Sequence, residues 1–273
     1  MGWWQEQKWQ RWQARYPLPD AAWRNVCTTL PLLAGLSETL LARLGMRSWR
    51  VLFELRLSLP REVEWSIEAH LEMAAQIALM GLGWSDRQAL EALGDTREII
   101  VVPGAFRRHV QELDDFGVMH EFDDERAGET SWGGPVVLSL EDIERSGDWQ
   151  GFNVIIHEFA HKLDMTGNMA VDGQPALPAH IDPKTWYDTF MRAWCALQDT
   201  LERGEVPAID EYAATHPSEF FAVCCEYFFS APDLLEGVWP DLYALLVRYF
   251  DQNPLERLHT LKSDHNDVAR PSS

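Results

Sequence analysis

The chain has 273 residues, of which 46% are hydrophobic and 24% charged, so it can bury a full core and is neither fibrous nor disordered. Its formal net charge of −20 repels phosphate backbones and anionic membranes, which argues against nucleic acid and membranes as direct partners. The start of the chain carries no apolar targeting segment and no run approaches the roughly 18 apolar residues of a spanning helix, so we expect a cytoplasmic protein.

The N-terminal segment is rich in tryptophan. Four tryptophans lie between Trp3 and Trp12 among Gln, Lys and Arg, and Tyr16-Pro17 follows, a pattern that predicts a short helix stopped by proline. We expect residues 1–20 to form an arm that docks its indoles on the main domain. A role at a membrane surface or with a partner is the alternative, weakened by the absence of a clean apolar face.

Two further helices are predicted before the first strand. Ser37 is placed to cap a helix that ends near Gly45. From Arg61 to about Gly81 a longer helix is expected, and it is almost wholly apolar after Ile67. That composition is typical of a buried central helix.

Two runs rich in β-branched residues predict a small sheet. They are Ile99 to Val102, closed by Pro103-Gly104, and Pro135 to Leu140. The acidic segment between them, from Glu112 to Glu129, is expected to form a strand or loop pair at the surface. The strand near Val136 is expected to pair with an extended substrate by β-augmentation.

The stretch His157-Glu158-Phe159-Ala160-His161 follows an apolar approach from Gly151 to Ile156, which indicates a helix. On a helix its two imidazoles lie on one face, four residues apart, and can bind one metal ion. This spacing is the zinc metallopeptidase signature, in which His157 and His161 are ligands and Glu158 is the general base. The alternative is a pair of ordinary helix histidines near an acidic patch.

Asp164 lies three residues after His161 on the same helix face. It is placed to accept a hydrogen bond from the second ring nitrogen of a ligand histidine. The alternative is an ordinary exposed carboxylate, because the neighbouring Lys162 indicates that this part of the helix is solvated.

The C-terminal part is predicted to be helical. One helix starts at the Asp182-Pro183 cap and continues to about Leu201, and a last helical region runs from Pro217 to about Phe250, broken near two prolines. Residues 21–260 are expected to form a single domain, and residues 261–273 a flexible polar tail.

A catalytic zinc usually takes three protein ligands, so a third must come from this C-terminal part. Glu219 stands in the first turn of an otherwise apolar helix, where an unpaired carboxylate would be costly to bury, and we favour it as the ligand. Glu211 and Glu226 are the alternatives, and for each a hydrogen bond to a ligand histidine is the more expected role.

The combined motifs resemble the Mlc titration factor A family of bacterial zinc peptidases. The resemblance rests on His157 to Asp164, on Gly134 to Leu138 and on Glu211 to Pro232, and it covers roughly Glu62 to Phe250. The tryptophan-rich arm falls outside it. The resemblance implies an α+β, mainly helical zincin-like fold of the gluzincin type, with a small mixed sheet and the HExxH helix.

The segment Pro217 to Ala222 also resembles the one that supplies the zinc-binding glutamate in the catalytic domain of anthrax lethal factor, which favours Glu219. In the same comparison Tyr212 matches a tyrosine whose hydroxyl is positioned at the metal and the scissile carbonyl. The family further implies an extra metal contact from His120 in the resting state. A solvated histidine in an acidic loop is the alternative for that residue.

The resemblance implies aminopeptidase-like hydrolysis of small peptides with one Zn²⁺ per chain. It also implies capture of the glucose repressor Mlc, which relieves repression of sugar-uptake genes. The main alternative is a non-catalytic binding protein that sequesters a repressor. A structural zinc site without turnover is weakened by Glu158, because a closed structural site needs no base beside its ligands.

Overall fold

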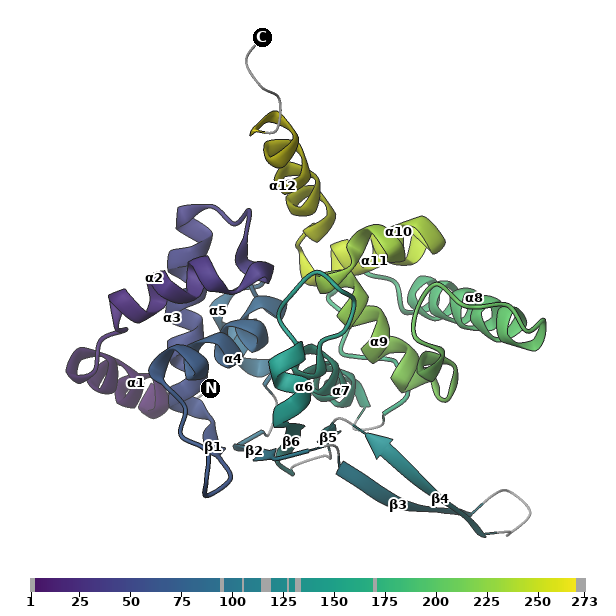
Figure 1. Cartoon of the computed structure of the whole chain (residues 1–273), viewed down its shortest axis with the longest axis horizontal. Helices are drawn as coiled ribbons and strands as arrows, with labels where there is room; N and C mark the ends of the chain where they lie inside the picture. Colours follow the sequence, from purple (N-terminus) through teal and green to yellow (C-terminus); the bar gives the residue numbers. More distant parts are fainter. Residues whose placement is uncertain are drawn as a thin grey trace.

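The computed structural model describes residues 3–93, 96–104, 106–113, 119–126, 128–130, 134–168 and 171–268. For residues 106–113, 119–126, 128–130, 168 and 264–268 it describes the backbone alone. The chain is mostly helical, with a small sheet at one edge (Figure 1). The N-terminal helices lie on one side of the molecule and the helices that follow the sheet lie on the other (Figure 1).

The N-terminal side is built from α1 (Trp3–Arg15), α2 (Asp20–Thr29), the 3-10 helix η1 (Pro31–Leu33) and α3 (Glu38–Glu54). As predicted, α1 ends just before Pro17. The rings of Trp9 and Trp12 lie 5.5 and 5.3 Å from the ring of Phe53 in α3, so these two indoles dock on the body. The division into arm, domain and tail stays a prediction.

Helix α3 does not end at Gly45, contrary to the prediction. Ser37 caps its first turn as expected, accepting from the N–H of Leu40, but the helix continues to Glu54. A Cβ atom on Gly45 would lie 2.7 Å from the indole of Trp23 in α2. Glycine is therefore required at position 45 because two helices pack closely there. It does not end the helix, as the sequence analysis had inferred.

Helix α4 (Ile67–Met80) is the buried central helix that the sequence predicts, although it begins later than Arg61. Its first turn is capped by Ser66, whose hydroxyl accepts from the N–H of Ala69 at 3.2 Å. The short helix α5 (Asp86–Glu91) follows, and Ser85 and Gln88 form a capping box at its start.

The sheet is mixed, as predicted. Its strands, in order across the sheet, are β1 (Arg56–Ser58), β2 (Glu98–Val102), β6 (Val136–Ser139) and β5 (Gly128–Thr130). The first three are parallel, and β5 is antiparallel to β6. Since β2 and β5 occupy both edges of β6, the predicted pairing of an extended substrate with that strand is wrong.

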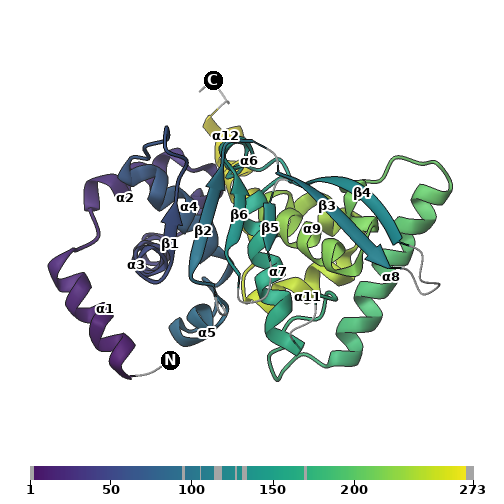
Figure 2. The same cartoon turned by 90° about the horizontal axis from the view of Figure 1, so that it is seen from below.

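One face of the sheet is buried because apolar side chains alternate along the strands. Ile99, Val101, Val136 and Leu138 are at most 3% exposed, whereas Ile100 and Val137 between them are only half-buried. The buried face packs on the helical body, and β5 and β6 contact α7 (Figure 2). The acidic segment from Glu112 to Glu129 was expected to form a strand or loop pair. It contains β4 (Met119–Arg126) but only the end of β3 (Phe106–Leu113), with which β4 pairs in antiparallel register.

The remaining helices are α6 (Leu140–Arg145), α7 (Val154–Asn168), α8 (Pro183–Glu202), the 3-10 helix η2 (Glu211–Ala214), α9 (Pro217–Ser230), α10 (Pro232–Val238), α11 (Pro240–Phe250) and α12 (Pro254–Val268). The predicted cap of α8 is confirmed, because Asp182 accepts from the N–H of Thr185 at 2.9 Å. The last region is broken at the two expected prolines, which stand at the first positions of α10 and α11. Helix α12 extends past the expected start of the tail.

The site depends on two of these helices. Helix α7 packs against α9 and also against α4. Nearly all of α9 is buried, including Phe220, Phe221, Phe228 and Phe229 at 1% exposure or less. Among the described residues, no helix has both the length and the apolar composition needed to cross a membrane.

Candidate metal centre

Helix α7 carries the His-Glu-Phe-Ala-His motif, as predicted. Asn153 is fully buried before its first turn, and its side-chain oxygen accepts from the N–H of Ile156 at 3.0 Å, as an N-cap does. The Asn153 amide also donates to the side chain of Gln76 in α4 at 2.7 Å. The start of the motif helix is therefore tied to the central helix, and the following turn is packed through Val154 and Ile156.

Helix α9 supplies a carboxylate at its own first turn. His216 caps it by accepting from the N–H of Ser218 at 3.2 Å, and Pro217 occupies the first helical position. Glu219 follows and is 4% exposed. This buried carboxylate needs a partner, and the packing of α9 on α7 places it opposite the two histidines.

Three donor atoms converge between the two helices. The Nε2 atom of His157 lies 3.2 Å from Nε2 of His161 and 3.1 Å from Oε2 of Glu219, and His161 Nε2 lies 3.2 Å from the same oxygen. Atoms bound to one tetrahedral zinc ion at about 2.0–2.1 Å lie about 3.3 Å apart. The residues present therefore fit a metal ion, and the three could hold one.

Glu226, one of the two alternatives for the third ligand, orients His157. The Nδ1–H of His157 donates to Oε1 of Glu226 at 2.7 Å, and the other oxygen of Glu226 accepts from the N–H of Asn153 at 2.7 Å. The hydrogen bond at Nδ1 leaves the lone pair on Nε2, which faces His161 and Glu219. The remaining alternative, Glu211, is exposed in η2.

The electrostatics of the site follow from burial and from these contacts. Burial alone would raise the pKa of Glu219, but the hydrogen bonds and charges of His157 and His161 outweigh it and hold that pKa well below the usual value. Burial acts against a charged His157 ring, yet Glu226 and Glu219 raise the pKa of His157 well above its usual value. The cluster thus favours positive charge beside the carboxylates, as a bound cation would provide.

Asp164 does not make the contact that was expected of it. It is fully buried and accepts from the backbone N–H of Gly173 at 2.8 Å, so its exposed alternative is also wrong. Lys162, which suggested a solvated turn, is 4% exposed and donates to the carbonyl of Gly134 at 3.1 Å. The hydrogen bond to the second ring nitrogen of His157 comes instead from Glu226, in another helix.

Glu158 and Tyr212 are both neighbours of His157, one in the chain and one in space. Glu158 directly follows His157 on α7 and is 3% exposed. Tyr212 lies in η2, where Asp210 accepts from its backbone N–H at 2.9 Å, and its ring centroid is 6.3 Å from that of His157. His120 pairs with Glu112 in the backbone register of β4 and β3, but its side chain lies outside the described residues.

The sequence analysis did not identify Asn153 and Gln76, the two residues that fix the start of the motif helix against α4. The signal for Asn153 was present, since an asparagine directly before an apolar helical run is a typical N-cap. Gln76 gave none. It is a polar residue on a buried apolar helix, 3% exposed, and its partner lies 77 positions away in the chain.

Histidine and glutamate donors that converge between two packed helices, in a mostly helical body with a small sheet, are compatible with a metallopeptidase. The chain belongs to the family described as glucose-regulated metallo-peptidase M90, whose family model matches residues 3–251. The match begins at Trp3. It therefore includes α1, which the resemblance seen in the sequence had left outside.

The chain is also similar to curated proteins named Mlc titration factor A. The relative from Edwardsiella ictaluri is 35% identical over 253 residues, which cover 90% of this chain and 91% of the relative. Those from Serratia proteamaculans and Yersinia pestis are each 34% identical, over 95% and 96% of this chain and 98% and 96% of their own lengths. The resemblance to the Mlc titration factor A family is confirmed.

Proposed function

We propose that the protein is a zinc-dependent aminopeptidase. The observation that carries this proposal is the convergence of His157 Nε2, His161 Nε2 and Glu219 Oε2 within 3.2 Å of one another, next to Glu158. Two imidazoles and one carboxylate form a donor set that suits zinc. Zinc bound there would lower the pKa of a water toward about 7 and polarise the carbonyl of a peptide.

Two residues of the chain would carry the proton transfers and charge stabilisation. Glu158 takes a proton from the attacking water and delivers it to the leaving amine. Glu158 is 3% exposed, so bulk water has little access to its carboxylate. Tyr212 donates a hydrogen bond from its hydroxyl to the carbonyl oxygen as negative charge develops on it.

The substrate proposal is a short peptide with a free N-terminus. An acidic protein surface suits the positive charge of such a terminus, and the formal charge of this chain is −20. An extended peptide would pair with β5, which forms one edge of the sheet in the part that the structure describes and contacts α7, the helix that carries the two donor histidines.

Hydrolysis of aminoacyl and N-acetyl-aminoacyl p-nitroanilides tests this function. The free aminoacyl compound should be cleaved by the zinc-loaded protein, and the acetylated one should not. Chelation should abolish cleavage and added zinc should restore it. The Glu158→Gln variant should retain zinc and lose turnover, so full hydrolysis by this variant, or by the chelated protein, would contradict the mechanism.

A second proposed function is the capture of a transcriptional repressor of the Mlc type in the cytoplasm. It is supported by the name of the relatives, Mlc titration factor A. Analytical ultracentrifugation of the Glu158→Gln variant with a purified Mlc-type repressor tests it, because that variant separates binding from turnover. Two species sedimenting independently at concentrations of tens of micromolar would exclude this role.

We also propose that His120 contacts the metal in the resting enzyme. A neutral imidazole at the place of the reacting water would lower the basal activity. His120→Ala should then raise peptide turnover without weakening zinc affinity, since three other ligands remain. Unchanged turnover would rule out this contact.

A further inference from the structure

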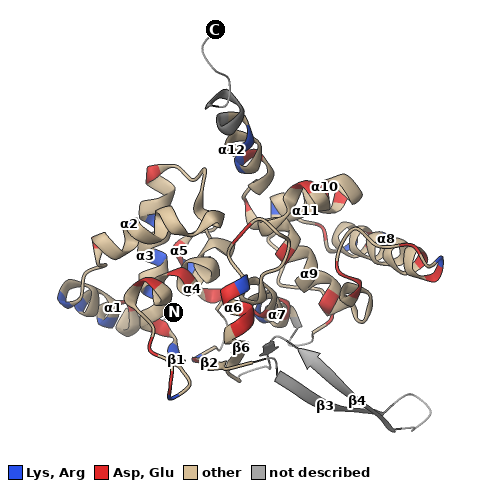
Figure 3. Ribbon diagram, in the orientation of Figure 1, with Lys and Arg blue, Asp and Glu red and all other residues tan. Residues whose placement is uncertain are grey.

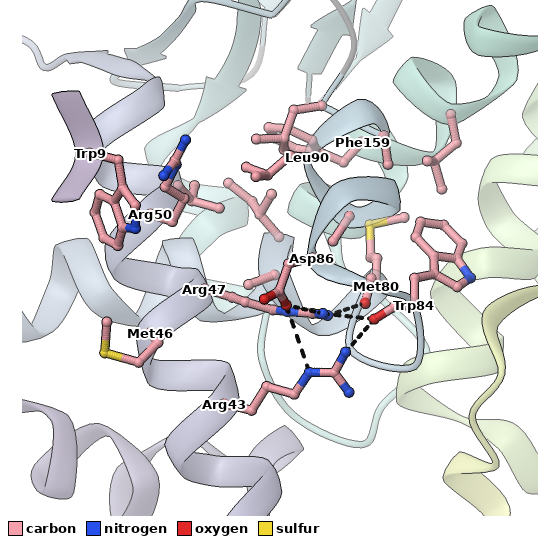
Figure 4. A pocket seen from close by; sticks show the side chains of 18 of the residues that line it. Trp9, Arg43, Met46, Arg47, Arg50, Met80, Trp84, Asp86, Leu90 and Phe159 are labelled. Carbon is pink, nitrogen blue, oxygen red and sulfur yellow. Dashed lines mark hydrogen bonds and ion pairs between the residues drawn. The ribbon is translucent and has the colours of Figure 1, made fainter. Parts of the chain in front are cut away.

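A cavity lies beside α7, the helix that carries His157 and His161. Its volume is about 290 Å³, and it is lined by residues of α1, α3, α4, α5 and α7 (Figure 4). From α7 it receives Phe159 and Leu163, each two residues beyond a ligand histidine. Two residues correspond to about 200° around a helix, so this cavity faces the side of α7 opposite to the metal donors.

Most of the cavity wall is hydrocarbon. Leu93, Met80, Phe159 and Leu163 are between 2% and 8% exposed, and Leu90 of α5 closes the wall beside them. A cavity of about 150 Å³ with walls of this kind holds one benzene molecule. The present cavity therefore has room for an apolar body of about two fused rings, or about ten carbon atoms.

The polar part of the wall is a row of arginines on α3. Arg43, Arg47 and Arg50 occur at helical spacing, so all three point to the cavity side, and Arg47 and Arg50 are 9% and 5% exposed. Arg50 pairs with two carboxylates, Glu54 at 2.6 Å and Glu6 at 3.3 Å. Its charge is balanced within the protein.

The other two arginines share one carboxylate. Arg47 donates to Oδ1 of Asp86 from Nε at 3.0 Å and from Nη2 at 2.6 Å, and Arg43 Nε lies 4.0 Å from the same oxygen. Within the described ranges, Asp86 is the carboxylate that pairs with both. In Figure 4 both guanidinium groups lie between Asp86 and the backbone carbonyl of Trp84, to which each also donates, and Leu90 and Phe159 lie farther along the cavity.

This end of the cavity therefore holds an excess positive charge in a strongly acidic protein. On α1 and α3 basic residues outnumber acidic ones, although the chain as a whole is strongly acidic (Figure 3). The Asp86 side chain is 82% exposed, and an ion pair to such a group contributes little. The Asp86 side chain can therefore rotate away into the solvent at a low cost in free energy, and another anion can then bind beside the two arginines.

We propose that this cavity binds a small carboxylic acid with an apolar body of about ten carbon atoms. Its carboxylate takes the place of Asp86 beside Arg47 and Arg43, where the planar guanidinium groups suit it. Its body contacts Leu90 and Phe159. The site is separate from the metal centre, and the proposal does not depend on peptidase activity.

Calorimetric titration with 1-naphthoate tests the proposal, with the neutral 1-naphthalenemethanol as the matched control. The titrations use the Glu219→Gln protein treated with a chelator, so that no metal competes for the carboxylate. A ligand of this size should bind with a dissociation constant between about 10 µM and 1 mM. The alcohol should bind about tenfold more weakly, since it lacks the charge-assisted hydrogen bonds.

Three variants locate the ligand. Leu90→Trp fills the cavity and should abolish binding, whereas Leu90→Ala at the same position should retain it. Asp86→Asn removes the competing carboxylate and should tighten binding of 1-naphthoate severalfold, but not of the alcohol. Arg43→Gln, on a side chain that is 40% exposed and tolerates change, should weaken 1-naphthoate about three- to tenfold.

Two outcomes would overturn the proposal. If 1-naphthoate does not bind, or binds equally well to Leu90→Trp, the cavity is not the site. If the acid and the alcohol bind equally and Asp86→Asn changes neither, the arginines do not select a carboxylate. Circular dichroism of each variant shows that a loss of binding is not a loss of fold.

Discussion

The ring of His157, in α7, lies between two glutamates of α9. Its Nδ1 atom is 2.7 Å from Glu226 and its Nε2 atom is 3.1 Å from Glu219. Glu219 and Glu226 are seven residues apart on α9, which is about two helical turns, so they lie on one face and contact the two nitrogens of the same imidazole. One carboxylate completes the donor cluster and the other sets the tautomer. This division of roles between two similar residues leads to opposite expectations for their variants.

Replacing Glu226 by Gln should lower zinc affinity about 10- to 100-fold without removing the site, because the neutral amide stabilises the ligand histidine less than a carboxylate. Glu226→Ala should cost more, since it also removes the acceptor for Nδ1–H. Competition with a chromophoric chelator measures both affinities. Glu211→Gln, in an exposed residue of η2, is the control and should leave the affinity unchanged. Equal affinities for all three proteins would refute the orienting role of Glu226.

Zinc should raise the melting temperature of the wild-type protein by about 5–10 °C when present at about one hundred times its dissociation constant. This follows from a linkage free energy of about 2.7 kcal/mol, with about 2–4 °C gained for each kcal/mol in a protein of this size. Glu219→Gln should lose the shift because it removes a donor. Thermal unfolding followed by circular dichroism, with zinc and with chelator, measures it. A full shift in Glu219→Gln would show that zinc binds elsewhere.

Tyr212→Phe should lower kcat of the proposed reaction by about 10²- to 10³-fold and leave KM nearly unchanged, because the lost hydrogen bond forms to charge that develops in the transition state. Steady-state kinetics on an aminoacyl substrate give both values. Tyr187→Phe, on a half-exposed ring of α8, is the control and should behave as wild type. A change confined to KM would assign Tyr212 to substrate binding.

The sequence predicted those parts of the site that depend on local pattern. Two histidines at helical spacing after an apolar run define a face of α7, and a carboxylate in the first turn of the apolar helix α9 needs a partner wherever that helix packs. The sequence also led us to expect a hydrogen bond from Glu226 to a histidine of the motif, which Glu226 makes with His157, but it did not indicate which histidine, and it gave Asp164 the wrong partner. Their partners are set by the packing of α7, α9 and the loop at Gly173, which no local periodicity contains.

The same distinction applies to the fold. Strands β2 and β6 and the proline-started helices were predictable, because β-branched runs and prolines act on their immediate neighbours. The position of β5 was not predictable from local pattern. It pairs with β6 and so occupies the strand edge that was expected to bind substrate. Gly45 was misread for a related reason, since its lack of a side chain serves a contact with another helix.

Gly45→Ala should destabilise the protein by about 1–3 kcal/mol, although alanine favours a helix over glycine. The new Cβ would stand 2.7 Å from the ring of Trp23 and 3.0 Å from Leu18, and overpacking of this kind outweighs the gain in propensity. Gly237→Ala is the matched control, since that glycine lies in α10 with no heavy atom within 4 Å of the new Cβ, and it should gain up to about 1 kcal/mol. Urea unfolding measures both, and a stabilised Gly45→Ala would contradict the packing account.

Asp164→Asn should stabilise the metal-free protein near pH 7.5 and have little effect near pH 4. Burial raises the pKa of Asp164 from 3.8 to about 6, so ionisation in the folded state costs free energy that the unfolded chain does not lose. The cost is absent below about pH 4, grows between pH 4 and 6, and reaches about 3 kcal/mol above that range.

Asparagine cannot ionise but still accepts from the N–H of Gly173, so the variant keeps the loop contact and removes the cost. Free energies of unfolding in urea, measured for both proteins at pH 4, 5, 6 and 7.5, should therefore diverge as the pH rises. Asp199→Asn, at an exposed position of α8, should run parallel to wild type. If the Asp164→Asn and wild-type curves also stay parallel, Asp164 does not carry this ionisation cost in the folded protein.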